Sequence, residues 1–302
     1  MSISAPSRTT ADGVRGRLEQ TVELLENRGY AFGAGRLAPV CLGGAVTVDQ
    51  LRQAVAESEV LVIREGLVVS RRMVDSLAAV RARALSHPLL VDAYRALTRE
   101  FVHALIRCCP YVLSVSIAGS LASGGFQASD DVDLNLIVED GHRHLAYVAL
   151  NLLGLVHALG HRSKPVDTHS ARPLAGRFMT ANLLLERSQC FPLARQDPAM
   201  AYEFLASEPV YGIEFWRSVV GANAGLSEHF PQILERTELY DMAPGPRLPS
   251  WLFPAALDGP ARRVGRLSWR FMQWTRRDRP EALARVAHVR QTMRPYALFD
   301  DA

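Results

Sequence analysis

Residues 112–138 read VLSVSIAGSLASGGFQASDDVDLNLIV, and this stretch decides the fold. It begins with a β-branched apolar run, turns at Gly119-Ser120, passes through a Gly- and Ser-rich spacer, and ends in a second apolar run. Such runs, bounded by turn residues, predict two strands. Because successive side chains of a strand point to opposite faces, we expect Asp131, Asp133 and Asn135 on one face of the second strand.

This pattern indicates a site for phosphate and a metal ion. Two carboxylates that point the same way repel each other, which raises at least one of their pKa values unless a cation lies between them. Mg²⁺ is the natural candidate, because it binds through a few carboxylates and substrate phosphates. Gly119 has no Cβ and allows a phosphate to approach, where backbone N–H groups and the Ser120 hydroxyl can hold it. The alternative is an exposed strand edge with solvated acids, which we disfavour because strands flanked by helices usually have both faces buried.

The residues before this stretch predict helices followed by a hairpin. Apolar residues recur at helical spacing from Val14 to Glu26, and Thr47 with Gln50 forms a capping-box pattern before a short helix. The run VLVIREGLVVS predicts two strands joined at Glu65-Gly66. This order suggests a winged-helix-like unit. Since it has no basic recognition helix, we favour a packing role over nucleic-acid binding.

The rest of the chain is mainly helical, with one further strand. Helical spacing covers residues 73–109, with an interruption expected near His87-Pro88, and then residues 142–159. FMTANLLLERS, residues 178–188, predicts a strand, and beyond Pro198 the pattern is helical to the end. We interpret Trp216 as a core residue and Asn223 as a local cap.

These elements predict an α/β (α+β) fold: a mixed-sheet core, an N-terminal winged-helix-like unit and C-terminal helices. The expected domains are residues 1–72, 73–195 and 196–302. The Pro- and Gly-rich link at residues 243–254 is the best candidate for a boundary in the sequence.

Composition excludes several classes of protein. The chain has 302 residues, 48% of them hydrophobic, so it can bury a full core and is not intrinsically disordered. Its N-terminal MSISAPSRTTADG lacks the apolar core of a secretory signal, and no apolar stretch reaches the ~20 residues of a membrane span. We expect a cytoplasmic protein with no membrane partner and with its four cysteines reduced.

Positive charge is concentrated near the C-terminus. Ten arginines against two acids give residues 259–295 a balance of +8. Four apolar residues in this segment lie at helical spacing: Val264, Leu267, Phe271 and Trp274. The arginines can therefore be the solvated face of a helix, an interpretation that we favour over contact with a polyanion such as nucleic acid.

The central motif resembles the signature of the DNA polymerase β-like nucleotidyltransferase superfamily. The matching residues are IAGSLASGGFQASDDVDLNLIV, in which Gly-Ser is followed by a spacer and an Asp-hydrophobic-Asp sequence. DDVDLN, NLLLERSQCFPL and AYEFLASEPVYGIEFWRSVVGAN are similar to a group of stand-alone prokaryotic nucleotidyltransferases. This similarity extends from about Gly66 to Pro231.

The resemblance implies a function and a set of roles. Gly119 and Ser120 would hold a nucleoside triphosphate, and Asp131 and Asp133 would ligate Mg²⁺ or Mn²⁺. An acceptor hydroxyl or phosphate oxygen would attack the α-phosphorus and release pyrophosphate. The expected acceptor is a small molecule. The alternatives are RNA, such as a tRNA end, a protein side chain, or a catalytically degenerate protein that only binds nucleotides.

A third carboxylate usually lies on a following strand in that superfamily, and three residues are candidates for it here. Alternation in TANLLLER puts Asn182 and Glu186 on one face. We prefer Glu186 because it retains the negative charge that a metal site needs. The alternative is that Glu186 is an ordinary surface acid at the end of the strand. Asp167, in an expected loop, is the third candidate. Lys164 and the nearby Arg162 could neutralise the triphosphate, or they could be solvated.

Overall fold

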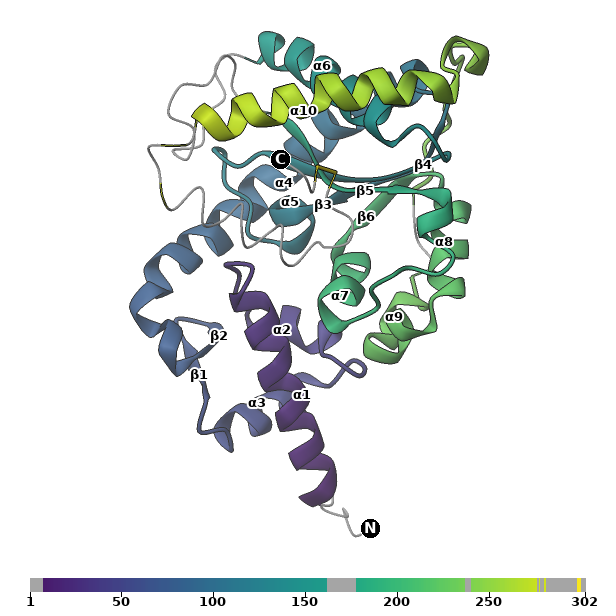
Figure 1. Cartoon of the computed structure of the whole chain (residues 1–302). Helices are drawn as coiled ribbons and strands as arrows, with labels where there is room; N and C mark the ends of the chain where they lie inside the picture. The colour runs from purple at the N-terminus through teal and green to yellow at the C-terminus, as the bar shows by residue number, and fades with distance from the viewer. Residues whose placement is uncertain are drawn as a thin grey trace.

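A computed structural model describes residues 8–161, 178–236, 240–275, 277, 280, 298 and 299. The fold is mixed α/β and is built on a four-stranded mixed sheet (Figure 1). Its strands, in the order in which they lie side by side, are β5 (Met179–Glu186), β4 (Val132–Val138), β3 (Val112–Ala118) and β6 (Glu208–Tyr211). β3 is antiparallel to both of its neighbours, whereas β4 and β5 are parallel. The two strands predicted from residues 112–138 are therefore the centre of the sheet.

The N-terminal region folds as helices and a separate hairpin, as the sequence predicts. It contains α1 (Arg8–Glu26), α2 (Ala34–Leu37), α3 (Val48–Ala56), β1 (Leu61–Arg64) and β2 (Leu67–Ser70). The capping box of α3 is confirmed: the Gln50 N–H donates to the Thr47 hydroxyl over 3.1 Å, and the Thr47 N–H donates to the Gln50 side chain over 2.9 Å. The hairpin turns at Glu65 and Gly66, both of which have positive φ.

Seven further α-helices, α4 to α10, complete the described part of the chain. They are α4 (Leu77–Cys108), α5 (Gly119–Ser123), α6 (Arg143–Gly160), α7 (Pro198–Ala206), α8 (Ile213–Ala222), α9 (Ala224–His229) and α10 (Asp258–Thr275). Short 3₁₀ segments lie at Ala38–Val40, Arg71–Ser76, Arg187–Gln189, Pro231–Ile233, Ser250–Leu252 and Ala255–Leu257. Among these described helices, none has both the length and the apolar character needed to cross a bilayer.

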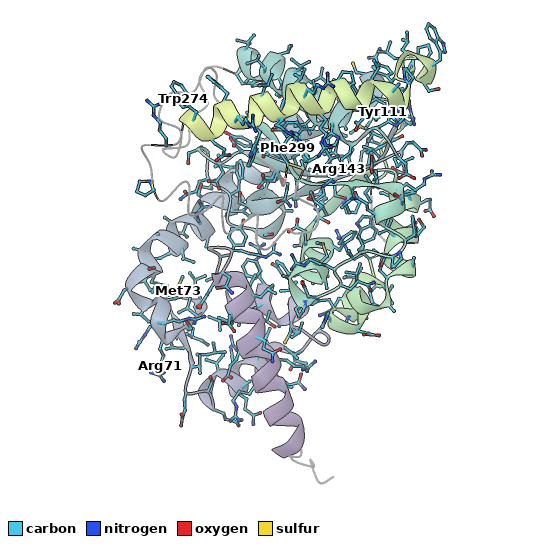
Figure 2. All side chains as sticks on the ribbon, viewed as in Figure 1. Arg71, Met73, Tyr111, Arg143, Trp274 and Phe299 are labelled. Carbon is cyan, nitrogen blue, oxygen red and sulfur yellow. The ribbon has the colours of Figure 1, made fainter. Side chains whose placement is uncertain are left out.

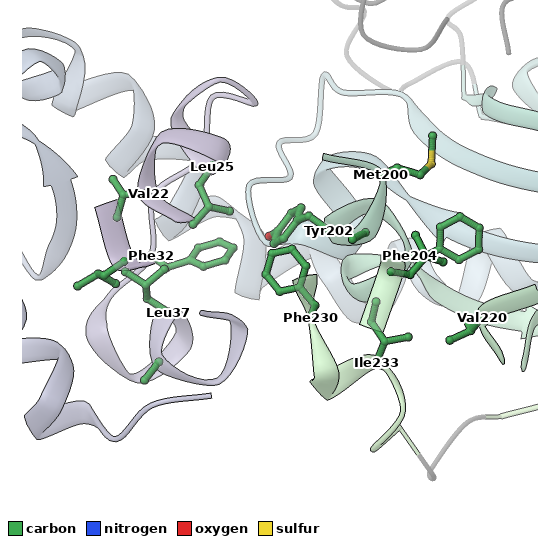
Figure 3. Packing of buried hydrophobic residues seen from close by; sticks show 14 of the residues in the cluster. Val22, Leu25, Phe32, Leu37, Met200, Tyr202, Phe204, Val220, Phe230 and Ile233 are labelled. Carbon is green, nitrogen blue, oxygen red and sulfur yellow. The ribbon is translucent and has the colours of Figure 1, made fainter. Parts of the chain in front are cut away.

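Two hydrophobic clusters cover the two faces of the sheet. The α6-side cluster joins α4 and α6 to one face through residues such as Phe101, Leu134 and Leu150. The α7-side cluster, on the other face, includes side chains from the N-terminal region and from α7 to α9, which meet in Figure 3. Its labelled members are Val22, Leu25, Phe32, Leu37, Met200, Tyr202, Phe204, Val220, Phe230 and Ile233. This cluster also contains Ile137 of β4, so it crosses both of the boundaries expected at residues 72 and 195.

Two of the predicted local structures are wrong. The segment Glu208–Tyr211 is a strand, not helix, and it contains Pro209, which an edge strand tolerates because it needs no ladder N–H on its outer side. α4 continues through Pro88 for 32 residues, about 48 Å, instead of breaking there. Pro88 removes one N–H···O bond, and the packing of buried residues on both sides of it, from Val80 to Phe101, offsets the loss.

The C-terminal helix packs through a different face from the one expected. The apolar stripe is exposed: Leu267 is 65% and Trp274 is 56% accessible, and Figure 2 shows Trp274 at the outer end of α10. α10 instead contacts α6 through small residues, because Ala261 is buried and a Cβ on Gly265 would lie 3.2 Å from the ring of Tyr147 in α6. Small residues allow two helices to approach closely, and a hydrophobic stripe does not by itself identify the packed face.

The interpretations of Trp216 and Asn223 are confirmed. Trp216 is 3% exposed within the α7-side cluster. The Asn223 amide donates to the backbone oxygens of Cys190 and Val219, and its Oδ1 accepts from the Leu193 N–H over 2.7 Å. Asn223 therefore ends α8 and holds the segment after β5 in place.

Candidate functional site

The end of β3 and the start of β4 bring the Gly-Ser turn against one of the predicted acids. In the antiparallel pairing Ala118 lies opposite Asp133, so Gly119 follows directly beside that carboxylate. Gly119 has φ +58°, and a Cβ on it would lie 2.8 Å from the Asp133 Cβ and overlap the carboxylate. Only glycine combines this conformation with so close an approach.

The polar face of β4 is the one predicted from alternation. Val132 and Leu134 are fully buried, whereas Asp133 and Asn135 are half-buried on the opposite face. Asp131 directly precedes the strand and is also half-buried. Thr180 of β5 donates its hydroxyl to Asp133 Oδ1 over 2.8 Å, so the neighbouring strand orients this carboxylate.

Ser120 lies at the same turn. It is 7% exposed, and its backbone oxygen accepts the N–H groups of Gly124 and Gly125, which closes the turn after α5. Its hydroxyl makes no hydrogen bond to any residue that the structure describes. Ser120 lies one residue from the contact between Gly119 and Asp133.

Glu203 of α7 lies under the polar face, and sequence reasoning missed it. Its Oε1 accepts from the amides of Asn135 and Asn182 over 3.0 and 2.8 Å, and its Oε2 forms an ion pair with Arg28 over 2.7 Å. Asn182 also donates to Asn135 Oδ1 over 2.8 Å. A single acid inside the apolar stretch AMAYEFLA was the available signal, because a buried carboxylate requires polar partners.

The preferred third carboxylate, Glu186, lies far from the acidic pair. It is at the end of β5, six residues beyond the Thr180 that contacts Asp133, which corresponds to about 20 Å along the strand. Its Oε1 accepts from the Gly141 N–H over 2.9 Å, and the same side chain caps the turn that ends at Gln189. Glu186 is therefore a strand-end cap, and the expectation that it completes the acidic site must be corrected.

Glu186 also lies on the wrong face, because the β4–β5 pairing is irregular. The register shifts opposite Asn135, so Asn182 is an extra residue on β5. Beyond that point Leu183 joins the α7-side cluster and Leu184 the α6-side cluster. Glu186 lies two residues after Leu184 and therefore shares its face of the sheet, the α6 side, which is opposite to the site.

The remaining candidates divide into two groups. Asn182 does lie on the polar face, as described above, but it is neutral and already bonded to Glu203. Asp167, Lys164 and Arg162 fall outside the described residues.

The N-terminal region forms one wall of the site. The Tyr30 ring lies against Gly125, where a Cβ would meet it at 2.5 Å. Burial, and next the charge on Asp133, raise the pKa of Tyr30 above its usual value, so its hydroxyl stays protonated. Arg83 of α4 binds the same loop, at Asp130 over 2.8 Å and at the Gly125 oxygen over 2.9 Å. The loop between β3 and β4 is thus held by both the N-terminal region and α4.

The donor set suits a metal ion that is bound partly by its substrate. Asp131 and Asp133 supply two carboxylates at the start of β4, an inner strand of the sheet. In the described part of the chain, no group of three His, Cys, Asp or Glu side chains could enclose a metal ion. Mg²⁺ and Mn²⁺ fit such a site, because Mg²⁺ commonly takes one or two carboxylates and completes its shell with phosphate oxygens and water.

The structure brings together four of the predicted residues, Gly119, Ser120, Asp131 and Asp133, and separates Glu186 from them. No family model, curated protein or solved structure matches this chain. What the site can do chemically therefore follows from its own residues and their geometry.

Proposed function

We propose that this protein is a Mg²⁺- or Mn²⁺-dependent nucleotidyltransferase that transfers a nucleoside monophosphate from a nucleoside triphosphate to a small-molecule hydroxyl or phosphate. The observation that carries the proposal is the contact between Gly119 and Asp133, where absence of a Cβ leaves the backbone of the Gly-Ser turn directly beside a carboxylate. A phosphate bound at that turn would share a metal ion with Asp131 and Asp133.

The residues of the chain would bind and orient the reacting groups. The Ser120 hydroxyl and the N–H groups of the turn donate to phosphate oxygens, and Thr180 keeps the Asp133 carboxylate pointing to the same place. A bound Mg²⁺ supplies charge stabilisation for the entering and leaving oxygens. The acceptor oxygen forms a bond to the α-phosphorus as the bond to the β-phosphate oxygen breaks, pyrophosphate leaves, and an acceptor hydroxyl releases its proton to water.

Calorimetric titration of nucleoside triphosphates, with and without Mg²⁺, tests this proposal. We expect binding that requires Mg²⁺ in the wild type and is at least tenfold weaker in the double variant Asp131→Asn, Asp133→Asn. Asp49→Asn is the matched control, because the Asp49 side chain is 95% exposed and lies far from the Gly-Ser turn in the sequence. Pyrophosphate release is then measured against a panel of hydroxyl and phosphate acceptors, and binding without any turnover across a complete panel would contradict transfer.

A second candidate, a nucleotide-binding protein that transfers nothing, is favoured by one observation. The β5 residues that contact the polar face of β4 are Thr180 and Asn182, where a third acid was expected. Nucleotide binding that is unaffected by Mg²⁺ and survives the double variant would favour this second function.

A further inference from the structure

The loop that follows α5 is packed tightly against the N-terminal region. Gly124 has φ +94°, and a Cβ on it would overlap the guanidinium of Arg36. A Cβ on the next residue, Gly125, would overlap the Tyr30 ring. Two consecutive glycines therefore let α2 and the segment before it reach the loop that begins at the Gly-Ser turn.

Two arginines contact this loop, Arg36 at Gly124 and Arg83 at Gly125, and Arg28 acts on the neighbouring Tyr30. Two of the three are neutralised. Arg28 is paired with Glu203 over 2.7 Å, and Arg83 with Asp130 over 2.8 Å. Arg36 is exposed, and no carboxylate of the described chain pairs with it. A positive charge is thus available beside the candidate site.

The groups around Arg36 orient it without cancelling its charge. Its guanidinium lies 4.7 Å from the centre of the Phe32 ring, a cation–π contact. The nearby His87 is buried, and burial, followed by the charges on Arg36 and Arg95, lowers its pKa to about 4, so it is neutral at pH 7. A guanidinium that is held by an aromatic ring and has no carboxylate partner among the described residues is suited to bind a phosphate, which it can contact through two N–H groups.

We propose that Arg36, contributed by the N-terminal region, binds the phosphate chain of the nucleotide. This inference rests on the function proposed above and names the cation of that same site. Gly124 ends the single-turn helix that begins at Gly119, so Arg36 lies roughly 7 Å along α5 from the turn beside Asp133. A phosphate chain that is bound at the Gly-Ser turn can extend along α5 to this guanidinium.

Calorimetric titration with magnesium tripolyphosphate and with Mg-ATP tests the role of Arg36. We expect Arg36→Gln to lower the affinity for both ligands by about 10- to 100-fold, which is the usual contribution of a hydrogen bond to a charged group. The affinity of Arg36→Lys should lie between those of Arg36→Gln and the wild type, because lysine keeps the charge but cannot donate two parallel hydrogen bonds. Arg52→Gln is the control, since Arg52 belongs to the same region, is 64% exposed and pairs only loosely with Asp49.

The outcomes separate this inference from the proposed function. Wild-type turnover together with unchanged tripolyphosphate binding in Arg36→Gln would overturn the role of Arg36 and leave the transferase intact. Binding that depends on Arg36 without turnover of any acceptor would support the role of Arg36 and count against transfer. If the wild-type protein binds neither magnesium tripolyphosphate nor Mg-ATP, both proposals are overturned together. Equal melting temperatures of Arg36→Gln and the wild type exclude misfolding as the cause of a loss.

Discussion

The guanidinium of Arg28, just after α1, and the carboxylate of Glu203, in α7, form an ion pair with a 2.7 Å Nη1–Oε2 distance. Arg28 also donates to the Ala199 oxygen over 2.8 Å and lies over the Tyr202 ring. Burial works against the charged form of Arg28, yet Glu203 holds the pKa of Arg28 above its usual value. The pair therefore links the N-terminal region to the polar residues beneath β4.

Removing Arg28 should destabilise the protein strongly. Arg28→Met leaves Glu203, whose side chain is only 8% exposed, with its two amide donors but no cation, and we expect the free energy of unfolding to fall by about 3 kcal/mol. Urea denaturation measures the change. Arg52→Met, at an exposed pair, should cost about 0.5 kcal/mol or less. Equal effects of the two substitutions would show that the Arg28 pair contributes no more than a surface pair.

Gly119→Ala should destabilise the chain and disturb the candidate site together. Alanine at a φ of +58° costs about 1 kcal/mol of folding free energy. The shift of Asp133 that is needed to make room for the new Cβ costs about 1 to 3 kcal/mol more. Urea denaturation and Mg²⁺-dependent nucleotide binding should both show a loss. Gly16→Ala is the matched control, because Gly16 lies inside α1 with open space around it, and a gain of about 0.5 to 1 kcal/mol is expected there. A neutral effect of Gly119→Ala would contradict the close approach to Asp133.

The sequence predicted those parts of the site that depend on neighbouring residues. The alternation of Asp133 and Asn135 along β4 and the Gly-Ser turn before it are local patterns, because the period of a strand is two residues. The face of Glu186 could not be predicted, since a one-residue shift in the pairing of β5 with β4 reverses the alternation beyond it.

Contacts between distant segments escaped prediction for a related reason. Arg28 and Glu203 are 175 residues apart, and neither carries a local pattern that points to the other. β6 was missed because four residues that include a proline form a strand only where an existing edge, that of β3, accepts them. In both cases tertiary packing decides the structure.

Asp258, the first residue of α10, caps α6 from outside that helix. Its Oδ1 accepts the N–H groups of His144 and Leu145, and its Oδ2 lies 2.7 Å from His144 Nδ1. Asp258→Ala leaves these donors without an acceptor and should lower the free energy of unfolding by about 1 to 2 kcal/mol. Asp49→Ala, at the exposed start of α3, should cost about 0.5 kcal/mol or less. A similar loss in the two variants would contradict the cap.

The contribution of Asp258 should also depend on pH. Burial works to raise the pKa of Asp258, but the hydrogen bonds from His144 and from the Leu145 N–H outweigh burial and lower it. An acid with a lowered pKa stabilises the fold above its unfolded pKa of about 3.9 and loses that effect as the pH falls through the folded value. Urea titrations between pH 6 and pH 2 should therefore show the difference between wild type and Asp258→Ala shrink at the acid end.

His87 should make the protein sensitive to mild acid. Burial, then the charges on Arg36 and Arg95, lower its pKa to about 4, whereas the unfolded chain has a histidine pKa of about 6.5. The unfolded state therefore takes up a proton below pH 6.5 that the folded state does not accept until about pH 4, and the free energy of unfolding falls across this interval. The buried Nδ1 has no hydrogen-bond partner in the described structure, so an apolar substitute should be tolerated.

The test compares the wild type with His87→Leu by urea denaturation at pH 7.5 and pH 5.0. We expect the wild type to lose more stability between these two pH values than the variant does, because only the wild type has this group to protonate on unfolding. Arg36→Gln removes one of the charges that disfavour protonation, so the NMR titration midpoint of His87 should rise in that variant. The same loss of stability in wild type and His87→Leu would show that another group controls the response to acid, and an unchanged midpoint in Arg36→Gln would place Arg36 too far from His87 to act on it.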